Sequence, residues 1–204
     1  METEARQSLS NTFADGSPGS DWKVSIRRIY WVQTELSELA PERSDGLVPN
    51  APADDESVDR AERRVGRKLP PSYREFLLEY DGWQRFLYGA SLLGTSGLGR
   101  SSYADLAQAA FEAEETPVPK GGPPSSRVRG YPDDLIPFGI DPTGTTVFAF
   151  DPASEDEHGE MGVIAWSNEI GVRADSFSAF LDTVVELCES DLALLRARGE
   201  SSRQ

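Results

Sequence analysis

The sequence predicts an α+β domain in which a mainly antiparallel sheet packs against helices. Three observations support this class. Helical patterns come first, over residues 21–39 and 57–82. Apolar segments separated by turn residues follow between positions 86 and 166, as is typical of antiparallel strands. An amphipathic pattern that begins at about Ser176 then predicts a long closing helix.

The N-terminal part is predicted to hold a leader, one helix and a linker. Residues 1–20 are mostly small and polar and predict a disordered leader. Residues 21–39 predict an amphipathic helix with Trp22, Ile26, Ile29, Tyr30, Leu36 and Leu39 on its apolar face. Three prolines and five acids in residues 40–56 indicate a linker. We expect the main domain at 57–198 and a short tail at 199–204.

Residues 57–82 predict two short helices joined by a proline corner. Ser57 is a candidate N-cap, and Gly66 stands where the first helix would end in the left-handed conformation. The proline pair at 70–71 breaks the chain and restarts it, because proline is tolerated in the first turn of a helix. Gly82 ends the second helix, whose apolar residues are Tyr73, Phe76, Leu77 and Tyr80.

A β-hairpin is predicted further along the chain. LIPFGI (135–140) and TTVFAF (145–150) flank the sequence Asp-Pro-Thr-Gly (141–144), whose proline and glycine suit a type I turn. Pro137 cannot donate a hydrogen bond to a neighbouring strand, so the first strand lies at a sheet edge or begins there.

The remaining elements are predicted more simply. Single strands are expected at 86–93 and 162–166, a helix at 103–114, and a flexible loop at 115–130, which holds four prolines. The closing helix carries its apolar stripe at Phe177, Phe180, Leu181, Val184, Val185, Cys188, Leu192 and Leu195.

The overall charge favours a basic partner. The 204 residues include 20 Lys and Arg against 35 Asp and Glu, which gives a net charge of −15. This charge argues against binding to nucleic acids or anionic membranes. Cys188 is the only cysteine, so no intramolecular disulfide forms, and this usage is typical of a reducing compartment. Together with a first segment that lacks the pattern of a signal peptide, it predicts a cytoplasmic protein.

Spaced residues in 58–82 resemble the signature of the SUKH superfamily. They are Val58, Glu62, Val65-Gly66, Leu69-Pro70, Tyr73, Phe76-Leu77 and Asp81-Gly82. Val65 stands where the family usually has Leu, and Asp81 where it has Asn. The hairpin and residues 175–181 resemble later blocks of the family, so the resemblance covers about 57–188.

The resemblance implies a non-enzymatic scaffold that binds proteins. Many bacterial members resemble immunity proteins that neutralise toxins, often nucleases or deaminases, while a fungal member regulates cell-wall assembly. The sequence therefore favours an immunity protein, with an intracellular regulatory scaffold as the alternative. No cofactor or metal is expected.

A stretch that contains acidic but no basic residues is the candidate partner-binding site. Between Gly130 and Val172 there is no Lys or Arg, and the acids are Asp133, Asp134, Asp141, Asp151, Glu155, Asp156, Glu157, Glu160 and Glu169. Such a stretch would attract a basic toxin surface, although acidic loops also simply keep proteins soluble. Trp83 is a candidate aromatic anchor for the partner, with core packing as the alternative.

Other candidate sites favour structural interpretations. Residues 94–101 approximate a phosphate-binding loop, but Arg100 replaces its lysine and the hairpin is antiparallel, so a nucleotide enzyme is a distant alternative. His158 lies in an acidic loop that offers too few nitrogen or sulfur ligands for zinc. The basic residues Arg60, Arg63, Arg64, Arg67 and Lys68 indicate a solvated helix face with local ion pairs.

Overall fold

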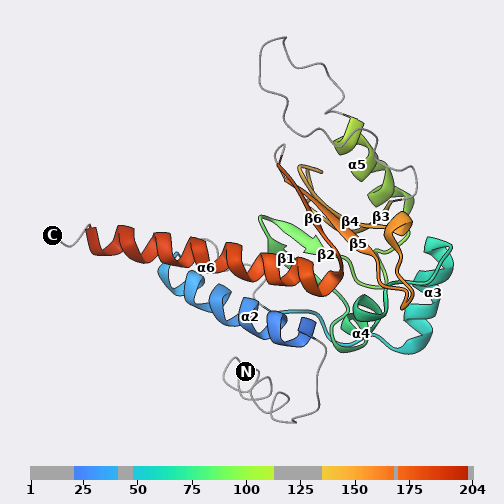
Figure 1. The fold of residues 1–204 in the computed structure, drawn as a ribbon, viewed down its shortest axis with the longest axis horizontal. Helices are drawn as coiled ribbons and strands as arrows, with labels where there is room; N and C mark the ends of the chain where they lie inside the picture. The colour runs from blue at the N-terminus through green and yellow to red at the C-terminus, as the bar shows by residue number, and fades with distance from the viewer. Residues whose placement is uncertain (1–20, 41–47, 113–134, 168–169, 202–204) are drawn as a thin grey trace.

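A computed structural model describes residues 21–40, 48–112, 135–167 and 170–201 (Figure 1). The described helices are α2 (Asp21–Leu39), α3 (Asp55–Val65), α4 (Pro71–Glu79), α5 (Ser101–Glu112) and α6 (Phe177–Ser201). The strands are β1 (Trp83–Leu87), β2 (Ala90–Leu92), β3 (Ile136–Ile140), β4 (Thr146–Asp151), β5 (Gly162–Ser167) and β6 (Ile170–Ala174). The strands form one sheet in sequence order, and each neighbouring pair is antiparallel. The predicted α+β class is confirmed.

The predicted hairpin is β3–β4. Its turn is closed by the N–H of Gly144, which donates to the carbonyl of Asp141 at 3.1 Å, and Gly144 has a φ of +74°. β3 is not an edge strand, because it lies between β2 and β4. Pro137 instead stands near its start, ahead of Gly139 and Ile140, the residues of β3 that pair with β2.

One strand prediction is wrong in detail, and one strand has no counterpart among the predictions. The expected single strand at 86–93 is a hairpin of β1 and β2, in which the chain reverses at Tyr88 and Gly89 with φ values of +50° and +81°. β6 was not predicted at all, although its pairing with β5 extends from Val163↔Ala174 to Ser167↔Ile170.

Helix α3 begins earlier than expected. Its N-cap is Asp54, whose carboxylate accepts a hydrogen bond from the N–H of Ser57 at 2.7 Å, so Ser57 is not the cap. Asp55 and Glu56, which were assigned to the linker, form the first turn of this helix. The predicted leader and the loop at 115–130 lie outside the described residues.

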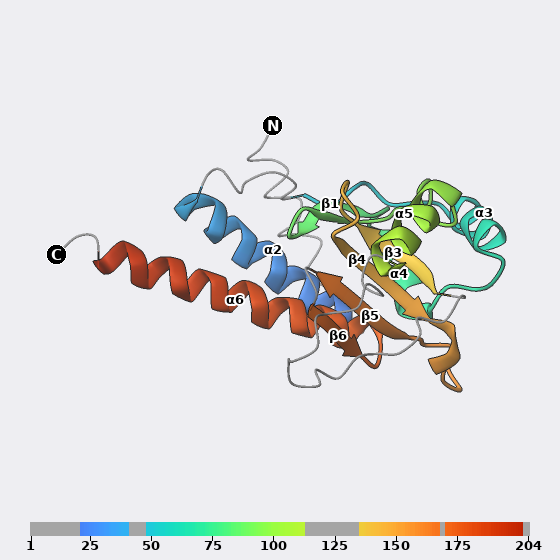
Figure 2. The same cartoon turned by 90° about the horizontal axis from the view of Figure 1, so that it is seen from above.

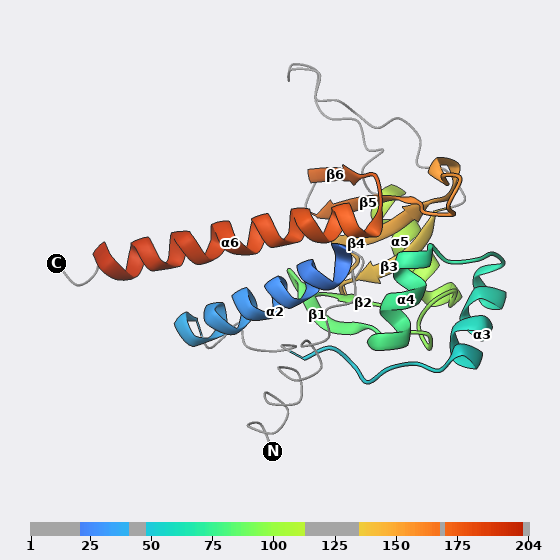
Figure 3. The same ribbon diagram turned by 60° about the horizontal axis from the view of Figure 1, so that its bottom comes forward.

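An aromatic core lies between the sheet and the helices α4 and α6. The rings of Phe138 and Phe150 on adjacent strands stack at 4.0 Å. Tyr73 of α4 packs edge-on against both rings, and Phe177 of α6 packs edge-on against Tyr73 at 5.0 Å. α5 lies on the other side of the sheet from α2 and α6 (Figures 1 and 3). β4 is accordingly buried along its whole length.

α2 and α6 run side by side in the same direction, away from the sheet (Figures 1 and 2). Three polar pairs join them in the same order along both helices: Ser25–Asp182, Arg28–Glu189 and Glu35–Arg196. The apolar faces that sequence periodicity predicted for both helices are buried in most positions. Leu39 is the exception in α2, because its side chain is 52% exposed. Among the described residues, no helix has the length and apolar character needed to cross a membrane.

Candidate partner-binding surface

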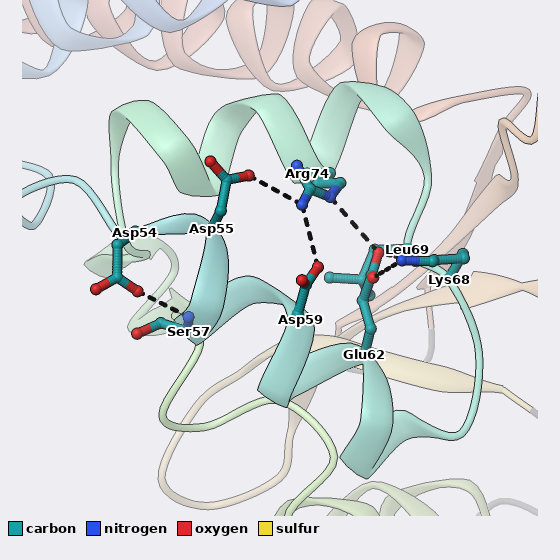
Figure 4. Close-up of polar contacts among 8 residues, drawn as sticks. All are labelled: Asp54, Asp55, Ser57, Asp59, Glu62, Lys68, Leu69 and Arg74. Atoms are coloured by element: carbon teal, nitrogen blue, oxygen red, sulfur yellow. Dashed lines mark hydrogen bonds and ion pairs between the residues drawn. The ribbon is translucent and has the colours of Figure 1, made fainter.

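The signature residue Glu62 is part of the fold rather than of an exposed site. Its side chain is only 4% exposed, and its Oε1 accepts a hydrogen bond from the N–H of Leu69 at 3.2 Å. Its Oε2 lies 2.6 Å from Nζ of Lys68. Arg74 of α4 reaches the same carboxylate at 3.8 Å (Figure 4). Glu62 thus fixes the corner between α3 and α4.

Arg74 gathers the acids of α3 against α4 (Figure 4). Its Nη2 lies 3.0 Å from Asp55 and 3.2 Å from Asp59. Burial acts to lower the pKa of the Arg74 guanidinium, but the hydrogen bonds to these carboxylates outweigh it, and the pKa is raised. The acids of α3 that face α4 are therefore occupied by contacts within the domain.

Asp81 and Gly82 have structural roles too. The carboxylate of Asp81 accepts hydrogen bonds from the backbone N–H and, at 3.0 Å, the hydroxyl of Thr95. Gly82 has a φ of +87° and lies against Gly94, so both glycines serve a close backbone crossing. The signature as a whole identifies the fold and leaves the binding surface to other residues.

The acid Asp141 is buried and holds the β3–β4 turn. Its carboxylate accepts hydrogen bonds from the N–H of Thr146 at 2.8 Å, from the N–H of Thr143 at 3.2 Å and from the Thr143 and Thr145 hydroxyls. Burial acts to raise the pKa of Asp141, but these hydrogen bonds outweigh it, and the pKa is lowered from 3.8. Asp141 is thus occupied by its own turn.

We expect Asp141→Asn to lower the free energy of unfolding by about 1–2 kcal/mol at pH 7, because a charged acceptor becomes neutral. The folded-state pKa lies below the unfolded value, so the stabilisation is present above about pH 4 and disappears as the pH falls through the folded pKa. Urea denaturation of both proteins between pH 7 and pH 3 measures this. A stability difference that stays constant over that range would contradict the assignment.

Asp151 is also used within the fold. It stands at the end of β4, opposite the end next to Asp141, and only 7% of the residue is exposed. Its carboxylate accepts a hydrogen bond from the N–H of Ala153 at 3.1 Å and lies 3.5 Å from Nη1 of Arg173. Asp141 and Asp151 therefore do not present free carboxylates on one common surface.

The other described acids of the predicted partner-binding stretch lie in the loop between β4 and β5. We call this loop the acidic loop (residues 152–161). Glu160 accepts hydrogen bonds from both the N–H and the hydroxyl of Ser72, each at 2.7 Å, and so caps the N-terminus of α4. Glu155 pairs with Arg67 at 2.9 Å. The acidic loop is thereby attached at two points, to the connection between α3 and α4 and to the first turn of α4.

The tip of the acidic loop is both ordered and exposed. The carboxylate of Asp156 accepts hydrogen bonds from the N–H groups of His158 and Glu160, at 2.8 and 2.9 Å. The side chain of Glu157 is 88% exposed, and its Oε1 lies 3.7 Å from Nε2 of the His158 imidazole. Neither Asp156 nor Glu157 forms an ion pair with Lys or Arg in the described part of the chain. These two carboxylates are available to a partner.

Trp83 does not belong to this surface. Its side chain is fully buried and packs edge-on against Phe86 at 5.3 Å, so the expectation of an exposed anchor is corrected. Asp133, Asp134 and Glu169 lie outside the described residues. The expected helix face with local ion pairs is wrong for Arg67, which lies beyond the end of α3 and pairs with Glu155, 88 residues away. No sequence signal connects Arg67 or Ser72 with the acidic loop, because both are far from it along the chain.

The glycine-rich segment at 94–100 is a compact turn. The N–H groups of Gly97 and Leu98 both donate to the carbonyl of Gly94, at 2.9 and 3.1 Å. Within the described ranges, no cluster of three or more His, Cys, Asp or Glu is arranged to hold a metal ion. Cys188 is buried, and burial raises the pKa of its thiol to about 12, so the reactive thiolate is scarce at neutral pH.

Residues 52–183 match the sequence model of the SMI1 / KNR4 family (SUKH-1). The match covers more than half of the chain, from just before α3 to within α6, and it leaves α2 outside. It confirms the family resemblance found in residues 58–82. No curated protein sequence matches the chain.

Proposed function

Because the chain belongs to the SMI1 / KNR4 family (SUKH-1), we propose that it is a non-enzymatic protein-binding domain. More specifically, it is an immunity protein that neutralises a basic toxin domain by direct binding. The observation that carries this proposal is the ordered, exposed acidic tip of Asp156 and Glu157. A nuclease domain is a fitting target, since it must be basic around its active site to hold phosphates.

The geometry of the acidic loop supports occlusion as the mechanism. Glu155 and Glu160 are held by Arg67 and Ser72, so the tip keeps its shape before a partner arrives. A preorganised loop loses little conformational entropy on binding. The uncompensated charge at the tip, together with the net charge of −15, speeds the encounter with a positive surface.

We expect Glu157→Lys to slow association with the partner about tenfold at low salt and to reduce the dependence of the rate on salt. Glu157 is the suitable position because Asp156 also holds the loop backbone. The partner is first captured from the native cell with the wild-type chain, and association rates are then measured by biolayer interferometry across ionic strengths. The matched control is Glu186→Lys, the same charge change at an exposed position of α6, which should alter the rate less than about twofold.

Equal slowing by both variants would show that only net charge matters, and a salt-independent rate would contradict electrostatic steering. Under the alternative of a regulatory scaffold, the partner would bind a different surface. The exposed side chains of Trp31 in α2 and Leu194 in α6 lie outside the family match and offer one. A partner whose binding is lost in Trp31→Ala but retained in Glu157→Lys would favour the scaffold.

A further inference from the structure

A basic cavity opens at the end of the molecule where α3, α5 and the start of β3 meet. Its volume is about 420 Å³, which lies within the range of small-molecule sites. Arg64, Arg67, Arg100 and Ser101 are among its lining residues. Every lining side chain that is charged at neutral pH is an arginine. In a chain of net charge −15, this local positive charge calls for an explanation.

Two of the three arginines have no acidic partner among the residues that the structure describes. In the part of the chain that the structure describes, Arg64 donates only to the carbonyls of Leu98 and Thr95, and Arg100 only to that of Ser96. Arg67 is paired with Glu155. Within the described ranges, two guanidinium groups at one cavity therefore lack a carboxylate partner, and guanidinium groups bind phosphate oxygens in bidentate geometry.

The cavity is built from fixed elements. Arg64 joins the last turn of α3 to the loop at 95–98 through its two carbonyl contacts. Gly99 lies so close to α3 that an added Cβ would stand 2.8 Å from the backbone nitrogen of Val65. Ser101, which begins the 12-residue helix α5, also lines the cavity, so the positive end of the helix dipole adds to the arginine charge.

The cavity lining also has an apolar part and an aromatic residue. Val65, Leu135, Ile136 and Pro137 supply this apolar part of the lining, which we call the apolar wall, and the partly buried Tyr103 belongs to the lining as well. We propose that the cavity binds a phosphate-bearing small molecule of nucleoside-diphosphate type. Its phosphates lie against Arg64, Arg100 and the start of α5, and its organic part packs on the apolar wall. This is a binding site separate from the acidic tip, and the proposal includes no chemical step.

The test is isothermal titration calorimetry of the full chain with ADP and with inorganic pyrophosphate at constant ionic strength. We expect saturable 1:1 binding of ADP, with affinity about tenfold higher than for pyrophosphate, since the apolar wall contributes. Arg100→Glu should weaken ADP binding at least about tenfold. The matched control is Arg63→Glu, next to Arg64 on α3 but not lining the cavity, which should change the affinity less than about twofold.

Three results would overturn the proposal. They are no binding of ADP at about 5 mM, equal weakening by the Arg100 and Arg63 variants, and equal affinity for ADP and pyrophosphate. Equal weakening would show that ADP binding depends only on the net charge of the protein. Equal affinity would show that the organic part of ADP contributes nothing to binding. Melting curves establish that each variant is folded, and Arg100→Gln replaces the glutamate variant if that one does not fold.

Discussion

Replacing Gly82 by alanine is expected to lower the free energy of unfolding by about 3 kcal/mol or more. Gly82 has a φ of +87°, a conformation that costs an L-residue about 1–2 kcal/mol. A Cβ there would also stand 2.6 Å from the nitrogen of Gly94 and 2.7 Å from the carbonyl oxygen of Leu92. Both of these are backbone atoms, so the clash is relieved only if the chain itself moves.

The matched control is Gly89→Ala. Gly89 has a similar φ of +81°, but an added Cβ would meet nothing within 4 Å. Gly89→Ala should therefore lose only the conformational contribution, about 1–2 kcal/mol of unfolding free energy. Urea denaturation of both variants and the wild type gives the comparison, and the difference between them isolates the steric term. Equal destabilisation by the two substitutions would show that the close crossing at Gly94 is not needed.

The crossing at Gly82 explains the glycine at this position of the family signature. The close approach to Gly94 brings Thr95 next to Asp81. The N–H and the hydroxyl of Thr95 then donate hydrogen bonds to the Asp81 carboxylate. The N–H of Asp81 donates to Ala51 at 3.0 Å, so the segment ahead of α3 is attached at the same place. One tight contact thus organises three segments that are distant in sequence.

Periodic elements could be predicted from the sequence, while elements set by local backbone reversals could not. α2, α4 and α6 each bury a face that repeats with the helical period, so pattern alone locates them. The β1–β2 hairpin turns at Tyr88, which adopts a positive φ that its residue type does not signal. Gly89 was the available sign of that turn.

The candidate site was predicted only in part, because composition does not show what an acid binds. Glu157 and Asp141 belong to the same acidic stretch, yet Glu157 faces solvent and Asp141 accepts hydrogen bonds within its own turn. For Asp141 a signal existed, since an Asp at the first position of an Asp-Pro-Thr-Gly turn commonly binds the following N–H groups. For Glu160 none existed, because its partner Ser72 lies 88 residues away.

Glu62→Ala is expected to destabilise the domain by about 3 kcal/mol, because a buried carboxylate that serves three partners is lost. The buried N–H of Leu69 would lose its acceptor, and Arg74 would lose one of the acids that hold it between α3 and α4. Lys68 is 79% exposed and can return to water, so its lost ion pair contributes little.

Two further variants separate the hydrogen bond from the charge. Glu62→Gln keeps an acceptor for the N–H of Leu69 and should lose about 1–2 kcal/mol. Glu56 lies on the exposed side of the same helix, and its ion-pair partner in the described part of the chain is Arg60, so Glu56→Ala should lose less than about 0.5 kcal/mol. Stability is measured by urea denaturation at pH 7. If Glu62→Ala loses less unfolding free energy than Glu62→Gln, the Glu62 carboxylate does not fix the corner between α3 and α4.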